Sequence, residues 1–246
     1  MSILNYPVMA YKVMVEKCYY WRCLKSKSYA LSFFRKYLPL DFIDGIGNKT
    51  LFDFGCGNGR VMMMGSNLGM KCVGFDIKGS QYLKRLVGKY SDSVRIRIGD
   101  FGRFFRLGLR DIDLFTFVQV YEFMENANRD GVFYKACEML KPNGYILFQT
   151  VNPSNMYTSK TGCKLSQTHT FFPYPTREYF MKIFERCGLE VVSEFYEGFR
   201  YPFWDSFLLK FMPYANTLCF DPPMLWKILK PQKRGFISFL LRKRNG

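Results

Sequence analysis

The sequence predicts an α/β domain in which a mostly parallel sheet is covered by helices on both faces. Three observations predict this fold class. From residue 50 onward, short apolar stretches alternate with helical patterns. The first of these stretches runs directly into a glycine-rich turn and then into a helix. Of the 246 residues, 48% are hydrophobic, which is enough to bury a substantial core.

The expected elements follow in chain order. Residues 94–99 alternate apolar with basic residues, which favours a strand near the edge of the sheet, whereas 113–120 is continuously apolar and favours a central one. The run 141–144 (Lys-Pro-Asn-Gly) ends a helix, and Thr176 is a typical N-cap. The expected strands span 51–55, 71–76, 94–99, 113–120, 145–151, 189–196 and 235–242, and the expected helices span 60–68, 81–90, 130–140 and 177–187.

The domain organisation predicted is a single large domain with additions. Residues 8–38 indicate one or two leading helices, broken near Pro39. We therefore expect N-terminal helices over 1–44 that pack on a core domain over 45–246. An aromatic-rich insertion at about 198–234 is either a small helical subdomain or a lid over a substrate.

Composition limits the compartment and the partners. The eight cysteines include no CxxC pair, so we expect reduced thiols and neither a disulfide framework nor a metal site. No signal-peptide pattern and no apolar run of about 18 residues is present, which favours a cytoplasmic protein with at most peripheral membrane association. The net charge of +16 is spread along the chain and favours anionic partners without selecting one.

A glycine-rich loop follows the first expected strand. The stretch 51–60 (Leu-Phe-Asp-Phe-Gly-Cys-Gly-Asn-Gly-Arg) leads through three alternate glycines into a helix. Glycine is needed where a ligand approaches the backbone closely or where φ is positive. The helix that follows offers free N–H groups and the positive end of its dipole. A dinucleotide-binding loop would have its third glycine one residue later, and a plain tight turn would have the same composition.

Two carboxylates end the next two strands. Asp76 lies about 20 residues beyond the loop, where a carboxylate can accept hydrogen bonds from both ribose hydroxyls. Asp100 can accept from an exocyclic adenine amine, with Phe101 as a flat neighbour. Because the carboxyl ends of parallel strands meet at one edge, we expect the loop and both acids around one crevice. The alternative is that these acids only cap turns or helices.

Over roughly residues 45–242 the chain resembles the class I (Rossmann-like) S-adenosylmethionine-dependent methyltransferases. Residues 53–59 match the first motif of that family, 113–123 its fourth-strand motif, and 138–147 its helix–turn–fifth-strand signature. The resemblance implies a seven-stranded sheet in the order 3-2-1-4-5-7-6, with the last strand antiparallel and helices on both faces. It also implies S-adenosyl-L-methionine as the cofactor.

The resemblance assigns roles to particular residues. The three loop glycines would flank the methionine part of the cofactor, Asp76 would hold its ribose, and Ile77 and Asp100 would lie beside its adenine. The cofactor-binding set expected on these grounds is Asp53, Gly55, Cys56, Gly57, Gly59, Asp76, Ile77, Asp100, Phe101 and Gln119.

A catalytic base is needed only if the methyl acceptor is a hydroxyl or a protonated amine. His169, the only histidine, lies on the loop after the fifth strand, and its ordinary pKa suits a base, although a lone loop histidine also serves as a local hydrogen-bond partner. Glu122 and Tyr121 at the end of the fourth strand are the alternatives. Many members of the family have histidine where this chain has Phe123, so no base is carried over from the resemblance.

The leading hypothesis for function is methylation of a small molecule or of a glycan or lipid-linked intermediate, at oxygen, with an anionic acceptor compatible with the charge. An RNA methyltransferase is the alternative that the basic charge suggests, although no RNA-binding module is visible. A non-catalytic partner subunit that has kept the fold is the third. The segment Asp221-Pro222-Pro223 is similar to a motif that marks methylation of planar amino groups, but only when the motif ends the fourth strand. Here it lies far beyond that strand, so it predicts a turn.

Overall fold

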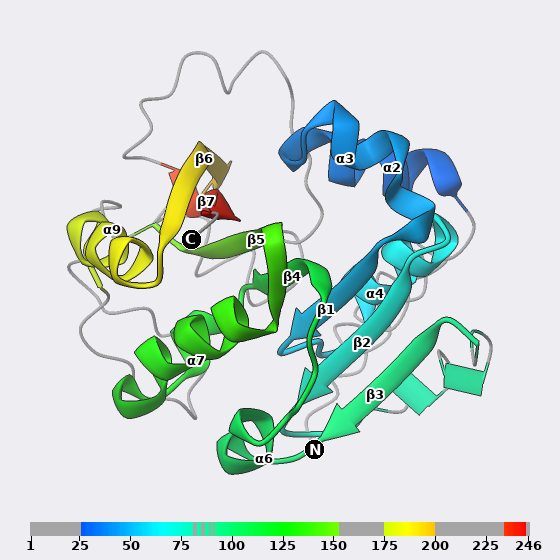
Figure 1. Ribbon diagram of the computed structural model, residues 1–246, viewed down its shortest axis with the longest axis horizontal. Helices are drawn as coiled ribbons and strands as arrows, with labels where there is room; N and C mark the ends of the chain where they lie inside the picture. The colour runs from blue at the N-terminus through cyan, green and yellow to red at the C-terminus, as the bar shows by residue number, and fades with distance from the viewer. Residues whose placement is uncertain are drawn as a thin grey trace, which may run out of the picture.

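The computed structural model describes residues 26–80, 83–84, 87–88, 90, 92–152, 175–199 and 234–244 (Figure 1). In this part of the chain, seven strands form one sheet in the order β3-β2-β1-β4-β5-β7-β6. The fold class and the strand order implied by the resemblance are therefore confirmed. The strands are β1 (Thr50–Phe54), β2 (Lys71–Asp76), β3 (Val94–Ile98), β4 (Ile112–Val118), β5 (Leu140–Val151), β6 (Leu189–Phe199) and β7 (Arg234–Lys243).

Strand direction follows the expected pattern. The first five strands are parallel to one another, and β7 is antiparallel to both β5 and β6. The central strand β4 is buried over nearly its whole length, which explains its uninterrupted apolar sequence. In β3, by contrast, Arg95 and Arg97 are exposed, because this strand forms one edge of the sheet. The edge position predicted from the alternating sequence is confirmed.

The two faces of the sheet bury different side chains because successive strand residues point to opposite sides. Leu51, Leu114 and Leu147 contribute to one core cluster, together with the methionines of α4. Phe52, Phe115 and Phe148 contribute to the other cluster. The first face is covered by α2 (Lys27–Tyr37), α3 (Leu40–Asp44) and α4 (Arg60–Asn67), and the second by α6 (Phe101–Phe105), α7 (Asn126–Met139) and α9 (Arg177–Arg186) (Figure 1).

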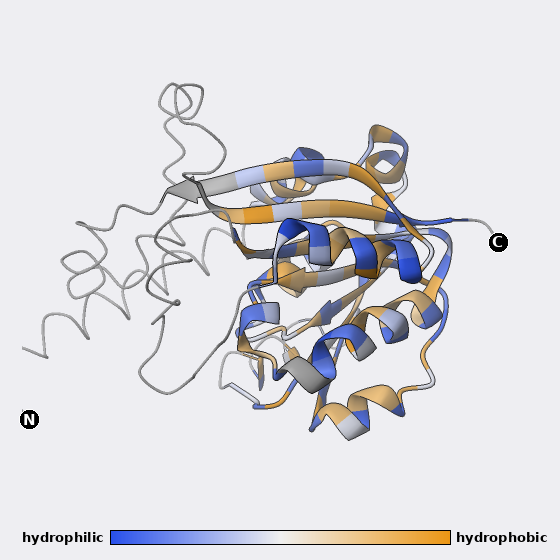
Figure 2. Cartoon of the chain, turned by 90° about the vertical axis from the view of Figure 1, so that its left-hand side faces the viewer, coloured by the Kyte–Doolittle hydropathy of each residue, from blue (hydrophilic) through white to orange (hydrophobic). Residues whose placement is uncertain are grey.

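The helices follow the cues that predicted them. Helix α9 begins at Thr176, whose hydroxyl accepts from the backbone N–H of Tyr179, and Gly188 follows its end with φ of 65°. Helix α2 ends before Leu38, whose backbone is extended as expected before a proline. In Figure 2 the helices carry hydrophilic and hydrophobic residues side by side, as expected for helices with one face against a sheet.

Some boundaries differ from expectation. Helix α7 begins at Asn126 and not at 130, and β5 extends back to Leu140 through the turn. Helix α6 was not expected, because five residues are too short to show a helical period. Of the expected helix 81–90, residues 83–84 and 87–88 are helical.

Several expectations lie outside the described residues. They are the leading helix before residue 26, His169, the turn at Asp221 and nearly all of the insertion 198–234. Helix α2 packs on the core through Ala30 and Phe34, but the division of the chain at residue 44 stays a prediction. Among the described helices, none is long and apolar enough to cross a membrane.

Candidate functional site

The glycine loop leaves β1 with a backbone that only glycine adopts easily. Gly55, Gly57 and Gly59 have φ values of 68°, 52° and 77°. A Cβ added to Gly55 would lie 2.1 Å from Cγ2 of Val120, whereas one added to Gly57 would meet nothing closer than 3.9 Å. Gly59 is the N-cap of α4 and offers no side chain to the first turn of that helix. The loop therefore presents backbone N–H groups to a ligand.

The loop is joined to the end of β2, where Asp76 lies. The backbone N–H groups of Gly55 and Cys56 donate to the carbonyl oxygen of Phe75 at 2.8 and 3.1 Å. The N–H of Gly57 donates to Oδ2 of Asp76 at 2.7 Å, and the N–H of Lys78 donates to Oδ1 at 3.0 Å. The structure thus brings the loop and the first of the two expected acids into direct contact.

Asp100 lies at the end of the neighbouring strand. The N–H of Gly99 donates to the carbonyl oxygen of Asp76 at 3.1 Å, which joins the two strand ends. Oδ1 of Asp100 accepts from the N–H of Arg103 at 2.8 Å, so this acid is also the N-cap of α6. Asp100 therefore caps α6 and also lies at the same edge of the sheet as Asp76. A role in binding adenine stays a prediction.

Two neighbouring apolar residues differ in exposure. Ile77 is 59% exposed at the same edge, as a residue in contact with a ligand would be before binding. The ring of Phe101 is partly buried and lies 6.2 Å from the ring of Phe54, between centroids. Ile77 is therefore the more accessible of the two for an adenine ring.

Asp53 is buried beneath the loop. It is 3% exposed, and its Oδ1 accepts from Oγ1 of Thr116 at 2.7 Å. Burial raises the pKa of the Asp53 carboxyl to about 7, with a further contribution from Asp76, while Thr116 and Arg60 oppose the shift. This carboxyl therefore titrates near neutrality. Sequence reasoning missed Thr116, although a polar residue inside an apolar strand is a usable signal.

The thiol of Cys56 lies in the same region. Cys56 is buried, and desolvation together with the charges of Asp53 and Asp76 raises the pKa of its thiol. The thiol therefore stays protonated and is not a nucleophile. Within the described ranges, no group of three or more histidine, cysteine, aspartate or glutamate side chains could hold a metal ion.

A chain of polar side chains crosses the sheet beyond the glycine loop. Gln119 has a φ of 56°, and its side-chain Nε2 donates to Oε1 of Gln149 at 3.1 Å. Nε2 of Gln149 in turn donates to Oγ of Ser238 at 3.1 Å. Of these three residues only Gln119 was expected in the site. Gln149 and Thr150 are polar residues near the end of β5, directly after an apolar run, and this pattern could have indicated Gln149 from the sequence.

Two of the three candidate catalytic residues are described, and both are buried. Glu122 is 2% exposed, and its Oε2 accepts from Oγ1 of Thr150 at 3.1 Å. Tyr121 is 1% exposed, with its ring packed against Phe148 and Phe180. Burial raises the pKa of the Tyr121 hydroxyl, so it stays protonated at neutral pH. The third candidate, His169, lies outside the described residues.

The strand order, the antiparallel last strand and the glycine loop joined to an acid at the end of β2 define the class I methyltransferase fold. A sequence model of the family described as methyltransferase domain matches residues 30–194, which is more than half of the chain. The chain belongs to this family and is an S-adenosylmethionine-dependent methyltransferase, as the sequence predicted. A search of curated protein sequences found no match.

Solved structures share the fold at low sequence identity. A SAM-dependent methyltransferase from Archaeoglobus fulgidus is 17% identical with a TM-score of 0.58, and the match covers 89% of this chain and 95% of the other. The 1,6-didemethyltoxoflavin-N1-methyltransferase of Burkholderia thailandensis, solved with its substrate and S-adenosylhomocysteine, is 10% identical with a TM-score of 0.56, covering 100% and 92%. The structure StiE O-MT is 18% identical with a TM-score of 0.51, covering 80% and 68%.

Proposed function

We propose that this chain transfers a methyl group from S-adenosylmethionine to a hydroxyl oxygen of a small molecule or of a glycan or lipid-linked intermediate. The observation that carries the proposal is the contact between the glycine loop and Asp76, at 2.7 Å, on the carboxyl edge of the sheet. Two structural neighbours support parts of this proposal: an N1-methyltransferase with bound 1,6-didemethyltoxoflavin supports a small-molecule acceptor, and StiE O-MT supports oxygen as the methylated atom.

The residues of the carboxyl edge fit the cofactor. The open space at Gly57 accommodates the methionine part beside the backbone. Asp76 uses one oxygen for the N–H of Gly57 and the other for that of Lys78, and a carboxylate has about four acceptor positions, so it can also accept from ribose hydroxyls. Asp100 and Ile77 take the adenine end in this proposal. The rest of the proposed cofactor site consists of Asp53, Cys56, Phe101 and Gln119.

Methyl transfer requires little chemistry from the protein's own side chains. The bound cofactor supplies a methyl group that is already activated by the positive sulfur. The protein orients the acceptor oxygen in line with that group and takes the hydroxyl proton. Because the raised pKa of the Tyr121 hydroxyl keeps it protonated at neutral pH, the base in this proposal is Glu122 or His169. Tyr121 contributes packing against Phe148 and Phe180.

The base assignment is tested with Glu122→Gln and His169→Asn. Loss of the base is expected to lower kcat about 100-fold or more with a hydroxyl acceptor, while the dissociation constant for S-adenosylhomocysteine stays within twofold. Turnover is measured as release of S-adenosylhomocysteine over a panel of phenols, sugars and lipid-linked glycans. The panel also includes amines of similar size, and turnover of the amines alone would remove the oxygen assignment.

The basic charge keeps RNA as a second candidate acceptor. A salt titration of RNA binding distinguishes an RNA acceptor from a small-molecule acceptor. Weak binding that is indifferent to sequence and disappears by about 0.2 M salt favours the small-molecule proposal. Tight binding to a structured RNA at that salt concentration, together with methylation of that RNA, favours the alternative. Binding of S-adenosylhomocysteine without turnover on any acceptor would favour a non-catalytic subunit.

The proposal includes a cytoplasmic location and two untested features of organisation. Support for the location comes from the described cysteines Cys56, Cys72, Cys137 and Cys187, all of which are free thiols. The N-terminal segment 1–44 is proposed to pack on the core. The insertion 198–234 is proposed to cover the acceptor, or else to form a subdomain of its own.

A further inference from the structure

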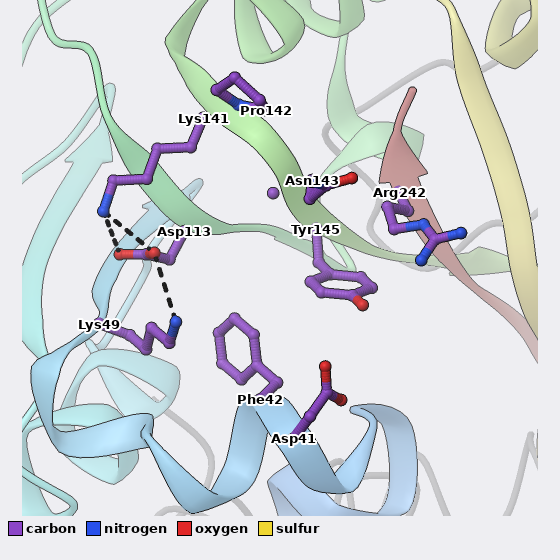
Figure 3. Close-up of a pocket in the computed structure, with 10 residues that line it drawn as sticks. Asp41, Phe42, Lys49, Asp113, Lys141, Pro142, Asn143, Tyr145 and Arg242 are labelled. Atoms are coloured by element: carbon purple, nitrogen blue, oxygen red, sulfur yellow. Dashed lines mark hydrogen bonds and ion pairs between the residues drawn. The ribbon is translucent and has the colours of Figure 1, made fainter. Parts of the chain in front are cut away.

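A cavity of about 600 Å³ lies at the edge of the sheet opposite the glycine loop (Figure 3). Strands β1, β4 and β5 are parallel and begin here, so this is the amino edge of the sheet. The lining comes from α3, from the residue before β1, from the starts of β4 and β5, and from the end of β7. Its residues are Asp41, Phe42, Lys49, Asp113, Lys141, Pro142, Asn143, Gly144, Tyr145 and Arg242.

One side of the cavity carries more positive than negative charge. Nζ of Lys141 lies 3.1 and 3.2 Å from the two carboxylate oxygens of Asp113, and Nζ of Lys49 lies 3.9 Å from one of them. The backbone N–H of Thr50 also donates to Asp113, at 2.8 Å. One carboxylate can neutralise only one of the two ammonium groups. Each ammonium has three donors, so both can hold Asp113 and a ligand at once.

A third cation, Arg242, lines the other end of the cavity. Figure 3 shows Arg242 on the far side of Asn143 from Lys141. Arg242 contacts Glu190 of β6 through Nε and Nη2, and its guanidinium has five donors in all. Its side chain is 44% exposed, so it remains accessible from solvent. Cations therefore flank the cavity on two sides.

The floor between the cations is rigid. The rings of Phe42 and Tyr145 are buried and meet edge to face, with centroids 5.6 Å apart. Nζ of Lys49 lies 5.4 Å from the centroid of the Phe42 ring, which limits its freedom. Because the cations are already held by Asp113 and Glu190, a ligand would not have to order them.

We propose that this cavity binds the phosphate group of a small molecule. The volume lies in the usual range for small-molecule sites. The three cations of the lining outnumber its two carboxylates, Asp41 and Asp113, by one, which suits an oxyanion; lysine acts as a point charge, and Arg242 has further N–H donors beyond those that contact Glu190. The exposed carboxylate of Asp41 lies below Tyr145 in Figure 3, so the phosphate is expected near Asn143 and Lys141.

The test is a titration of the isotopically labelled full chain, followed by backbone amide NMR. The probes are inorganic phosphate, phenyl phosphate and benzoate. Both phosphates are expected to shift the amides of 41–50, 141–145 and 242 saturably, and benzoate is expected to bind at least tenfold more weakly. Tighter binding of phenyl phosphate than of phosphate assigns the site to a phosphate ester, and equal binding assigns it to the free ion.

A matched pair of variants tests the location. Asn143 has a φ of 59°, which aspartate and glycine both tolerate, and neither change removes a cation of the cavity or Asp113. Asn143→Asp is expected to weaken phosphate binding at least tenfold, and Asn143→Gly less than threefold, at equal melting temperatures. Arg95→Gln, on the exposed edge strand β3, controls for loss of general positive charge and is expected to leave binding within twofold.

Three results would overturn the proposal. The first is the absence of saturable shifts up to about 20 mM of either phosphate, which is weaker than any specific site would be. The second is benzoate binding as tightly as the phosphates. The third is an Asn143→Asp variant that folds and binds phosphate like the wild type.

Discussion

The two edges of this sheet are built for recognition in different ways. At the carboxyl edge, backbone groups are exposed by three glycines with positive φ, and Asp76 is held against them by main-chain N–H groups. At the amino edge, long side chains form ion pairs around Asp113, over a floor of buried rings. Gly55 has no room for added atoms, because a Cβ there would lie 2.1 Å from Cγ2 of Val120, whereas the amino edge presents charged groups at the ends of long side chains.

This difference predicts how each edge responds to substitution. Changes at the carboxyl edge should remove cofactor binding, because the ligand touches the backbone itself. Changes at the amino edge should alter stability slightly and leave the cofactor unaffected, because β1 and β4 separate the two edges. Substitutions at the two edges, and at Asp53 beneath the glycine loop, test this contrast.

Gly55→Ala is expected to be the most damaging change. The new Cβ would lie 2.1 Å from Cγ2 of Val120 and would require a φ of 68°. We expect a loss of about 3 kcal/mol or more in unfolding free energy and no measurable binding of S-adenosylhomocysteine. Urea denaturation and calorimetry measure the two effects. As a control, Gly108→Ala, where a Cβ meets nothing within 4 Å, should cost almost no stability.

Asp76→Ala is expected to weaken binding of S-adenosylhomocysteine about 30-fold, because hydrogen bonds from ribose to a carboxylate are lost. Calorimetry gives the dissociation constant, and a melting curve shows whether the loop has also lost stability through its contact with Gly57. An unchanged affinity in the folded variant would remove Asp76 from the site. Asp100→Ala should have a smaller effect, because Asp100 is expected to accept from a single adenine amine, whereas Asp76 is expected to accept from both ribose hydroxyls.

Asp53 gives the chain a pH-dependent stability. The pKa of this carboxyl is about 7 in the folded protein, against 3.8 as its ordinary value. The folded state therefore binds the proton more tightly, and stability falls as pH rises from about 4 to about 7. Relative to Asp53→Asn, the wild type should lose about 2 kcal/mol between pH 5.5 and 7. Urea denaturation at several pH values measures this, and parallel curves for the two proteins would contradict it.

Asp113→Asn is expected to have the smallest effect. It removes the charge that Lys49 and Lys141 share but keeps an oxygen for the N–H of Thr50. We expect a loss of about 1 kcal/mol in stability and a dissociation constant for S-adenosylhomocysteine within twofold of the wild type. A large loss of cofactor affinity here would mean that the two edges are coupled.

Asp100 shows that two interpretations of one residue need not compete. The sequence allowed a helix cap or a ligand-binding acid, and the structure shows the cap at a strand end joined to that of Asp76. Helix α6, which it caps, could not be predicted because a single turn carries no periodic signal. Helix α9, by contrast, was predicted from Thr176 and Gly188 at its two ends. A cap residue therefore predicts a helix only when the helix is long enough to show a helical period.

By itself, the sequence determined the order of strands and helices, the glycine loop and the acids at the ends of β2 and β3. These features depend on neighbouring residues and on the rule that parallel strands end at one edge. Only the tertiary structure decided that Thr116 bonds to Asp53, 63 residues away, that Gln149 bonds to Ser238, 89 residues away, and that Lys141 reaches Asp113. Such pairs depend on strand register and side-chain direction, which are fixed only when the sheet and its helices pack together.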